Sequence, residues 1–145
     1  MIKLHSVYEY HEPERILYEL LLERDPNVNI SHMVVPSFDQ HASFVQHRPY
    51  REWLLIVEDA SLEVVGAIIL TENNEIGIGI FKAHQRKGIA HMAIWELMSR
   101  YQPLHAITGR RAGHFIANIN PDNEASIKLF TGLGARHIQN TYQFD

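Results

Sequence analysis

The stretch HQRKGIAHM, residues 84–92, decides the fold of this chain. Charged side chains run into Gly88, and after it apolar residues recur at helical spacing. The first N–H groups of a helix have no partner within the helix, and the helix dipole makes that end positive. With Lys82, Arg86 and Lys87 nearby, the stretch predicts a loop that binds an anion such as a diphosphate. A solvated basic turn before a core helix is the alternative.

The sequence just before this stretch, EIGIGI at residues 75–80, reads as a strand. Its isoleucines can fill one face, while Gly77 and Gly79 leave the other face bare. Glycine inside a strand weakens it and often marks the close approach of a ligand or of another backbone. The pattern therefore favours a ligand site, although a strand packed tightly beneath a helix would show the same pattern.

The hydrophobic period changes along the rest of the chain. Strand-like runs separated by turn sequences form an antiparallel meander in the middle. The predicted helices cover residues 13–24, 37–47, 88–101 and 123–135, and the predicted strands cover residues 53–57, 64–70, 76–81, 114–119 and 135–144. This order predicts one α+β domain over residues 1–145, with a mixed, mostly antiparallel central sheet flanked by helices.

Composition narrows the classes of function. The 145 residues are 46% hydrophobic and 21% charged, as expected for a globular protein. The formal net charge of −4 argues against nucleic acid as the main partner. No cysteine is present, which excludes disulfides and cysteine nucleophiles and favours a cytoplasmic setting. We expect no signal peptide and no membrane span, which needs roughly 18 apolar residues. No histidine pair has a strong metal-binding signature, so we expect no metal.

Two ordered motifs resemble those of the GNAT superfamily of N-acetyltransferases. Residues 85–90, QRKGIA, match the family's Gln/Arg-x-x-Gly-x-Gly/Ala signature and lie between a β meander and an amphipathic helix, as in the family. Residues 120–135, NPDNEASIKLFTGLGA, resemble the family's segment in which Asn-x-x-Ala/Ser leads to an aromatic residue and then to Leu-Gly-Phe/Ala. The resemblance covers residues 50–145 well, and the N-terminal third only through its two helices.

The resemblance implies that acetyl-CoA is the co-substrate and that the sheet splays apart between the family's fourth and fifth strands, here residues 76–81 and 114–119. It assigns the diphosphate to the signature loop, the pantetheine arm to the end of the preceding strand, and further coenzyme contacts to the downstream motif. The residues so assigned are Gln85, Arg86, Lys87, Gly88, Ile89 and Ala90, then Ile78, Gly79 and Ile80, and finally Asn120, Asn123, Ser126 and Phe130. A helix N-terminal cap is the alternative role for Asn123.

Acetyl transfer to an amine needs a donor for the developing oxyanion and a base for the proton of the amine. The resemblance places the backbone amide of Ile80 beside the thioester, as the oxyanion donor. Glu75 is the first candidate base, acting directly or through water, and an exposed turn carboxylate is its alternative role. His84 and His114 are the next candidates, because histidine titrates in the right range.

Phe130 stands where the family often has a tyrosine that protonates the leaving thiolate. Phenylalanine has no proton to give, so the thiolate would leave unaided or take a proton from water. Its own pKa makes that tolerable near neutral pH. Tyr142 is the only tyrosine nearby in the sequence, and it also fits simple strand packing. The general acid therefore stays open.

The acceptor is the least determined part of the predicted reaction. Residues 37–59 look like a subgroup that acetylates amino sugars, and Arg48, Tyr50 and Arg51 could contact a polar or phosphorylated acceptor or form a charged rim. We expect a primary amine of a small molecule to attack the thioester directly. A peptide or protein amine, and a non-catalytic acyl-CoA-binding module, are the alternatives. A homodimer paired through the C-terminal strand is an open assembly.

Overall fold

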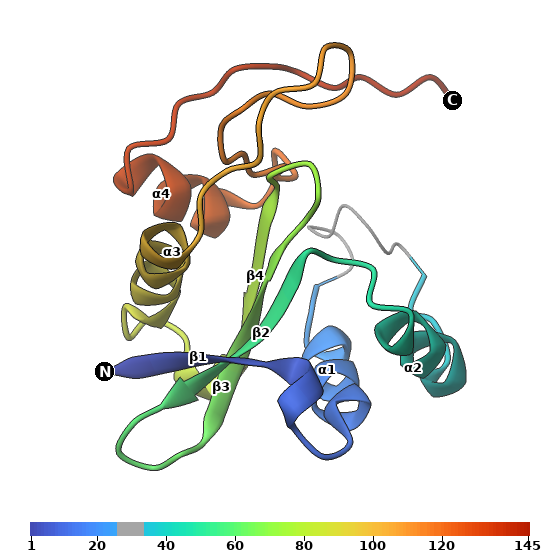
Figure 1. Ribbon diagram of the computed structural model, residues 1–145, viewed down its shortest axis with the longest axis vertical. Coiled ribbons are helices and arrows are strands. Elements are labelled where there is room, and N and C mark those ends of the chain that lie inside the picture. Colours follow the sequence, from blue (N-terminus) through green and yellow to red (C-terminus); the bar gives the residue numbers. More distant parts are fainter. Residues whose placement is uncertain (26–33) are drawn as a thin grey trace.

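The chain forms a four-stranded antiparallel sheet with helices on both faces (Figure 1). The computed structural model describes residues 1–25 and 34–145. The sheet has the order β1-β2-β3-β4, and its strands are β1 (Ile2–Ser6), β2 (Glu52–Glu58), β3 (Val64–Leu70) and β4 (Ile76–Ile80). The predicted α+β class and the central meander are confirmed. The sequence prediction lacks β1, which pairs with β2 from Ile2 opposite Glu58 to Ser6 opposite Leu54.

The four predicted helices form, and their ends lie within a few residues of the predicted ones. They are α1 (Pro13–Leu22), α2 (Phe38–Gln46), α3 (Ile89–Arg100) and α4 (Glu124–Gly132). Pro13 opens α1, where its missing N–H costs nothing. Ser37 and Gln40 form a reciprocal capping box at the start of α2. In the described part of the chain no helix combines the length and apolarity that crossing a membrane requires.

The alternation of β2 shows how one strand serves two cores. Leu54 and Ile56 are buried in the cluster that includes α3 and α4, whereas Trp53, Leu55 and Val57 are buried in the cluster that includes α1 and α2. Burial of such a side chain contributes about 1.5–3 kcal/mol relative to exposure. A register shift of one residue would exchange the two sets, so the two cores fix the register of the sheet.

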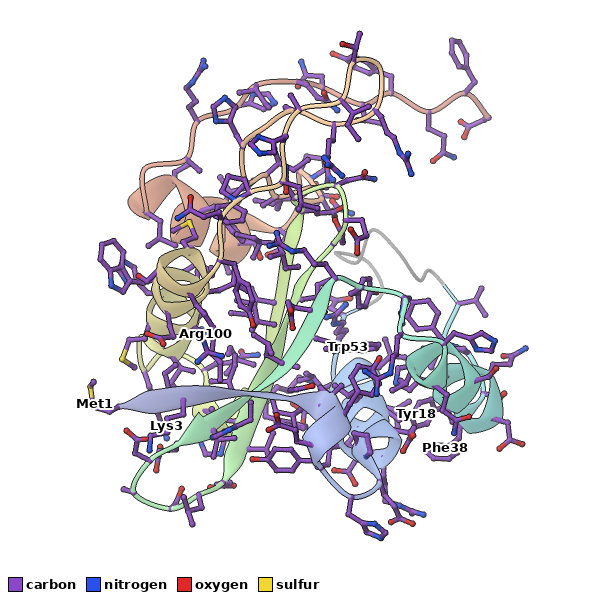
Figure 2. All side chains as sticks on the ribbon, viewed as in Figure 1. Met1, Lys3, Tyr18, Phe38, Trp53 and Arg100 are labelled. Atoms are coloured by element: carbon purple, nitrogen blue, oxygen red, sulfur yellow. The ribbon has the colours of Figure 1, made fainter. Side chains whose placement is uncertain are left out.

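Side-chain contacts fasten the helices in place on both faces (Figure 2). Tyr18 of α1 meets Phe38 of α2 edge-on, with ring centroids 5.4 Å apart. On the other face, Arg100 at the end of α3 donates from Nη1 to the backbone carbonyl of Leu4 in β1 at 3.2 Å. The first contact holds two helices together, and the second joins a helix to the edge of the sheet.

Two of the predicted strands are wrong. Residues 114–119 pair with the head of β4 only at an isolated parallel bridge between Glu75 and Ile116. Residues 135–144 form no strand and are exposed, with Ile138 62% and Phe144 99% accessible. A β-prone sequence needs cross-strand neighbours to become a strand. Because residues 114–119 form no continuous ladder, the last segment has no regular edge beside it.

Candidate active site

The outer edge of β4 is open beyond its first residue. In an antiparallel pair, alternate residues point their N–H groups toward the partner strand. Phe81 donates its N–H toward β3 at 2.9 Å, whereas Ile76 donates on the opposite side, to the carbonyl of Ile116 at 2.8 Å. Ile78 and Ile80 share the orientation of Ile76, so their N–H groups point to the edge that no described strand covers. The Ile80 amide is therefore open to a ligand at this edge, and its oxyanion role stays a prediction.

Gln85 ties the signature loop to the end of β4. Its side-chain Nε2 donates to the carbonyl oxygen of Ile80 at 3.0 Å. After it, Arg86 and Gly88 both adopt left-handed backbone conformations, with φ of 64° and 76°. A Cβ at Gly88 would meet nothing within 4 Å, so the glycine is required for its backbone conformation rather than for space.

The start of α3 presents a row of backbone N–H groups. No side chain caps the helix. The first N–H that finds a carbonyl here belongs to Met92, which donates to Gly88 at 3.2 Å. Among the described residues, the amides of residues 86–91 have no backbone acceptor. Such amides at a helix N-terminus can bind an anion, and the diphosphate assigned to this loop stays a prediction.

The bare face of β4 lies beneath α1. A Cβ on Gly79 would come 3.4 Å from Nη2 of Arg24 and 3.5 Å from Cδ2 of Leu20. The isoleucines of β4 point the other way, into the core beside α3. The distances at Gly79 are ordinary contact distances, and a Cβ on Gly77 would lie 2.9 Å from Cγ1 of Ile69 in β3, so the packing of α1 does not decide between the two readings of EIGIGI.

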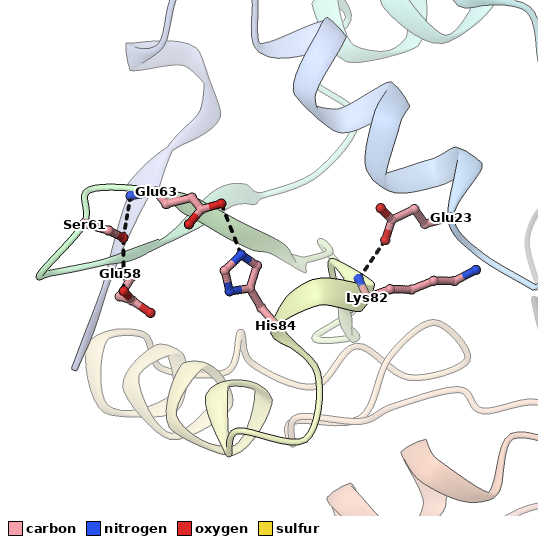
Figure 3. A network of polar contacts seen from close by, with 6 residues as sticks. All are labelled: Glu23, Glu58, Ser61, Glu63, Lys82 and His84. Atoms are coloured by element: carbon pink, nitrogen blue, oxygen red, sulfur yellow. Dashed lines mark hydrogen bonds and ion pairs between the residues drawn. The ribbon is translucent and has the colours of Figure 1, made fainter.

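His84 and Lys82 serve the scaffold around the loop (Figure 3). His84 Nε2 lies 3.2 Å from Oε1 of Glu63, in the turn between β2 and β3. The backbone N–H of Lys82 donates to Oε1 of Glu23, just after α1, at 2.7 Å. Both contacts fasten the short 3-10 helix Lys82–His84 to neighbouring elements. With its Nε2 directed at Glu63, His84 is a weak candidate for the base.

Glu75 lies at the head of β4, half-buried, and belongs to a small polar group. Burial raises the pKa of the Tyr50 phenol, the Arg24 guanidinium opposes that rise, and the Glu75 carboxylate adds to it. Tyr50 packs edge-on against Trp53, with ring centroids 4.8 Å apart. The group joins a carboxylate, a neutral phenol and a guanidinium on the α1 side of the sheet.

The other acceptor candidates have local structural partners. Arg48 stacks over the ring of Tyr8, with Cζ 4.0 Å from the ring centroid. Arg51 donates from Nη1 to the carbonyl of Gln102 at 2.9 Å. The candidate base His114 lies on an exposed bend. Tyr142, the tyrosine considered as general acid, is 83% exposed. Of the predicted acceptor residues, Tyr50 is the one whose pKa the charge of Glu75 affects.

The downstream motif is held largely by its own contacts. Oδ1 of Asn123 accepts from the backbone N–H of Ser126 at 3.1 Å and caps α4. Oδ1 of Asn120 accepts from the N–H of Asp122 at 2.9 Å. Phe130 is 9% exposed and packs in the core beside α3. The cap role of Asn123 is thus present, and the coenzyme contacts assigned to this motif stay predictions.

Asn74 positions the site, and sequence reasoning assigns it only to a turn. It is fully buried, with φ of 66°. Its Nδ2 donates to the carbonyls of Leu104 and Ala112 at 3.0 and 2.9 Å, and its Oδ1 accepts from the N–H of Leu104 at 2.7 Å. The adjacent asparagines in TENNE predict a turn, but no local signal reveals partners this far along the chain.

Comparisons with known proteins agree on one family and fold. A profile of the Acetyltransferase (GNAT) domain matches residues 12–136. A solved domain from Methanocaldococcus jannaschii is similar over 97% of this chain and 92% of its own, at 20% identity and a TM-score of 0.73. RimL, a ribosomal L7/L12 alpha-N-protein acetyltransferase solved with coenzyme A, is similar over 90% of this chain and 77% of its own, at 21% identity and a TM-score of 0.65.

A spermidine N-acetyltransferase from Vibrio cholerae is similar over 68% of this chain and 60% of its own, at 22% identity and a TM-score of 0.52. A comparison with curated protein sequences found no significant match. At these identities the structural likeness carries the fold, and the acceptors named for RimL and for the spermidine enzyme belong to those proteins.

Proposed function

This chain belongs to the GNAT acetyltransferase family, whose members are acyltransferases that use acetyl-CoA, and from that premise we propose that it acetylates a primary amine of a small molecule. One observation carries the proposal. The open edge of β4 adjoins the amides at the start of α3, which have no backbone acceptor among the described residues, and Gln85 joins the two through its bond to Ile80. A strand edge and an anion-binding loop are the two surfaces that an acyl-CoA needs.

The backbone groups of the loop and strand suit the parts of coenzyme A. The amides of residues 86–90 suit the diphosphate, because they are unpaired at a helix N-terminus. Open backbone groups on Ile78 and Ile80 suit the amides of the pantetheine arm, which can pair with a strand edge as a peptide would. In this arrangement Arg86 and Lys87 contribute more through their backbone N–H groups than through their charges.

Acetyl-CoA supplies the thioester, and the chain supplies a donor and a base. The N–H of Ile80 points to the open edge and donates to the thioester oxygen as negative charge develops there. Glu75 accepts the proton of the attacking amine, directly or through one water molecule. Because Phe130 has no proton to donate, the thiolate leaves unaided or is protonated by water. No covalent enzyme intermediate is needed.

We keep an amino sugar as the first acceptor to test, with a peptide or protein amine second. The reaction is placed in the cytoplasm, because a chain without cysteine needs no oxidising compartment. A homodimer is proposed through the exposed C-terminal segment, whose apolar side chains could pair with a second copy. Light scattering of the purified protein tests the assembly, and a monomer would remove it.

Acceptor screening tests the proposed function. Purified protein is incubated with acetyl-CoA and a panel of amino sugars, polyamines and peptides, and the release of free thiol is measured. Release with an amine, together with the mass of the acetylated product, supports the proposal. Acetyl-CoA binding without release across the panel would favour the non-catalytic module. Failure to bind acetyl-CoA would overturn the site itself.

A further inference from the structure

Arg24 places a positive charge directly beside the proposed reaction centre. It follows α1, and its Nη2 lies 3.4 Å from the position of a Cβ on Gly79. Gly79 is the neighbour of Ile80, whose amide is the proposed oxyanion donor. Because Gly79 has no side chain, nothing from β4 itself separates the guanidinium from the α1 face of the strand.

The end of α1 holds Arg24 in this position. Leu20 and Leu21 of α1 are buried. The backbone N–H of Arg24 donates to the carbonyl of Leu21 at 3.1 Å. The preceding residue, Glu23, accepts from the backbone N–H of Lys82 at 2.7 Å, as Figure 3 shows. A cation is also stabilised by the negative end of a helix dipole. These contacts fix the backbone from which the Arg24 side chain extends.

The charge of Arg24 has no counter-ion in the described part of the chain. The ion pairs there involve Arg15, His84 and Arg100. The Arg24 side chain is exposed, and the protein around it lowers the pKa of the guanidinium by partial desolvation. Arginine stays charged at neutral pH. An exposed guanidinium without a described counter-ion is available to bind an anionic group of a ligand.

The neighbours of Arg24 suit a ligand that carries both charges. The charges of Arg24 and Glu75 both act on the phenol of Tyr50, whose pKa is raised by burial. A planar guanidinium binds carboxylate and phosphate groups with two parallel hydrogen bonds. Glu75 would attract the ammonium group of the acceptor before that group loses its proton. A polyamine, which carries only positive charges, would be repelled at Arg24.

We propose that Arg24 is a specificity-determining residue that binds a carboxylate or phosphate on the acceptor, so that the preferred acceptors are amines with an anionic group a few bonds from the nitrogen. This inference rests on the proposed acetyl transfer and names the substrate class of the same site. The anionic group should be close to the acceptor nitrogen because Arg24 lies over Gly79, one residue from Ile80. Carboxylate and phosphate both present oxyanions to the guanidinium, and the matched probes below distinguish the two groups.

Matched acceptor pairs test the proposal by kcat/KM. The pairs are alanine with alaninamide and glucosamine 6-phosphate with glucosamine, and spermidine serves as a polycation. We expect the wild type to prefer the anionic member of a pair by about 10- to 100-fold. Arg24→Met should give equal kcat/KM values for the two members of that pair, and Arg24→Lys should keep part of the preference for the anionic member. Arg15→Met removes the same charge from the exposed side of α1 and should change nothing.

A binding arm keeps the result decisive when no amine turns over. Glucose 6-phosphate against glucose, and propionate against propionamide, are titrated by calorimetry into the protein saturated with coenzyme A. Binding of an anionic probe to the wild type and its loss in Arg24→Met support the subsite, even if the proposed transfer fails. Transfer without preference, unchanged in Arg24→Met, overturns the subsite and leaves the transfer standing. No preference in either arm overturns the subsite.

Discussion

The two ends of β4 differ more than its five residues suggest. At the head, Ile76 and Asn74 exchange hydrogen bonds with Ile116, and the Asn74 side chain holds a distant loop. At the other end, the outward N–H groups of Ile78 and Ile80 meet no described strand, and the signature loop begins beside them (Figure 1).

This difference shows that one strand can pair with a neighbouring segment at its head and keep an open edge at its other end, if the pairing with that segment stops early. The single bridge at Glu75 holds residues 114–119 near the head and lets them diverge afterwards. The predicted splay between these segments takes that form here. The edge beyond the bridge is the part left for a ligand, so changes at the closed head and at the open end should have separable effects.

Loss of the Asn74 amide should have the largest effect on stability. Asn74→Ala removes three buried hydrogen bonds and an asparagine suited to its positive φ. We expect the free energy of unfolding to fall by about 3–5 kcal/mol, measured by urea denaturation. The neighbouring exposed Asn73→Ala is the matched control, with a change of about 0.5 kcal/mol or less. Equal effects at the two positions would contradict the role given to the closed head.

A carboxylate in the loop at the open end should remove coenzyme binding with little loss of fold. In Gly88→Glu the side chain has room, but its charge would face the diphosphate. We expect the Kd for coenzyme A, measured by calorimetry, to rise by about 100-fold or more. Gly88→Ala has only the cost of its positive φ, about 1–2 kcal/mol, and should bind more tightly than the glutamate variant. Equal affinities in the two variants would mean that the diphosphate lies elsewhere.

Gly66 tests how closely β3 must approach the open end. A Cβ there would lie 2.3 Å from the carbonyl oxygen of Gly79, so Gly66→Ala forces the two strands apart. We expect a loss of about 1–3 kcal/mol in thermal or urea unfolding. Gly79→Ala is the matched control, since its Cβ would make ordinary contacts at 3.4 Å or more. A larger loss at Gly79 than at Gly66 would reverse this account of the strand pair.

The smallest effect should appear only at alkaline pH. Burial raises the pKa of Tyr50, so the unfolded chain releases this proton at lower pH than the folded chain does. Stability is therefore unaffected below pH about 10, the ordinary pKa of tyrosine, and falls above it. Tyr50→Phe should make the free energy of unfolding fall less steeply between about pH 9.5 and 11. An unchanged slope would mean that Tyr50 is not desolvated.

The sequence predicts the parts of this molecule that depend on local pattern. The isoleucine-glycine alternation gives β4, and the apolar spacing after Gly88 gives α3 within a residue at each end. It cannot show whether a β-prone segment finds a partner, and residues 114–119 and 135–144 do not form ladders. Long-range contacts are missed for the same reason, since Asn74 and Arg24 act on residues far along the chain.

The hydrogen bond between Glu23 and Lys82 joins the acceptor side of the molecule to the coenzyme side, and its two partners are unequal in one respect. The donor is a backbone N–H, so any residue except proline at position 82 preserves it. The acceptor is a side chain, so the junction depends on the identity of residue 23 alone. During divergence, a single codon can loosen or restore the link between the two halves of the site, while the other side of the junction is almost immune to substitution.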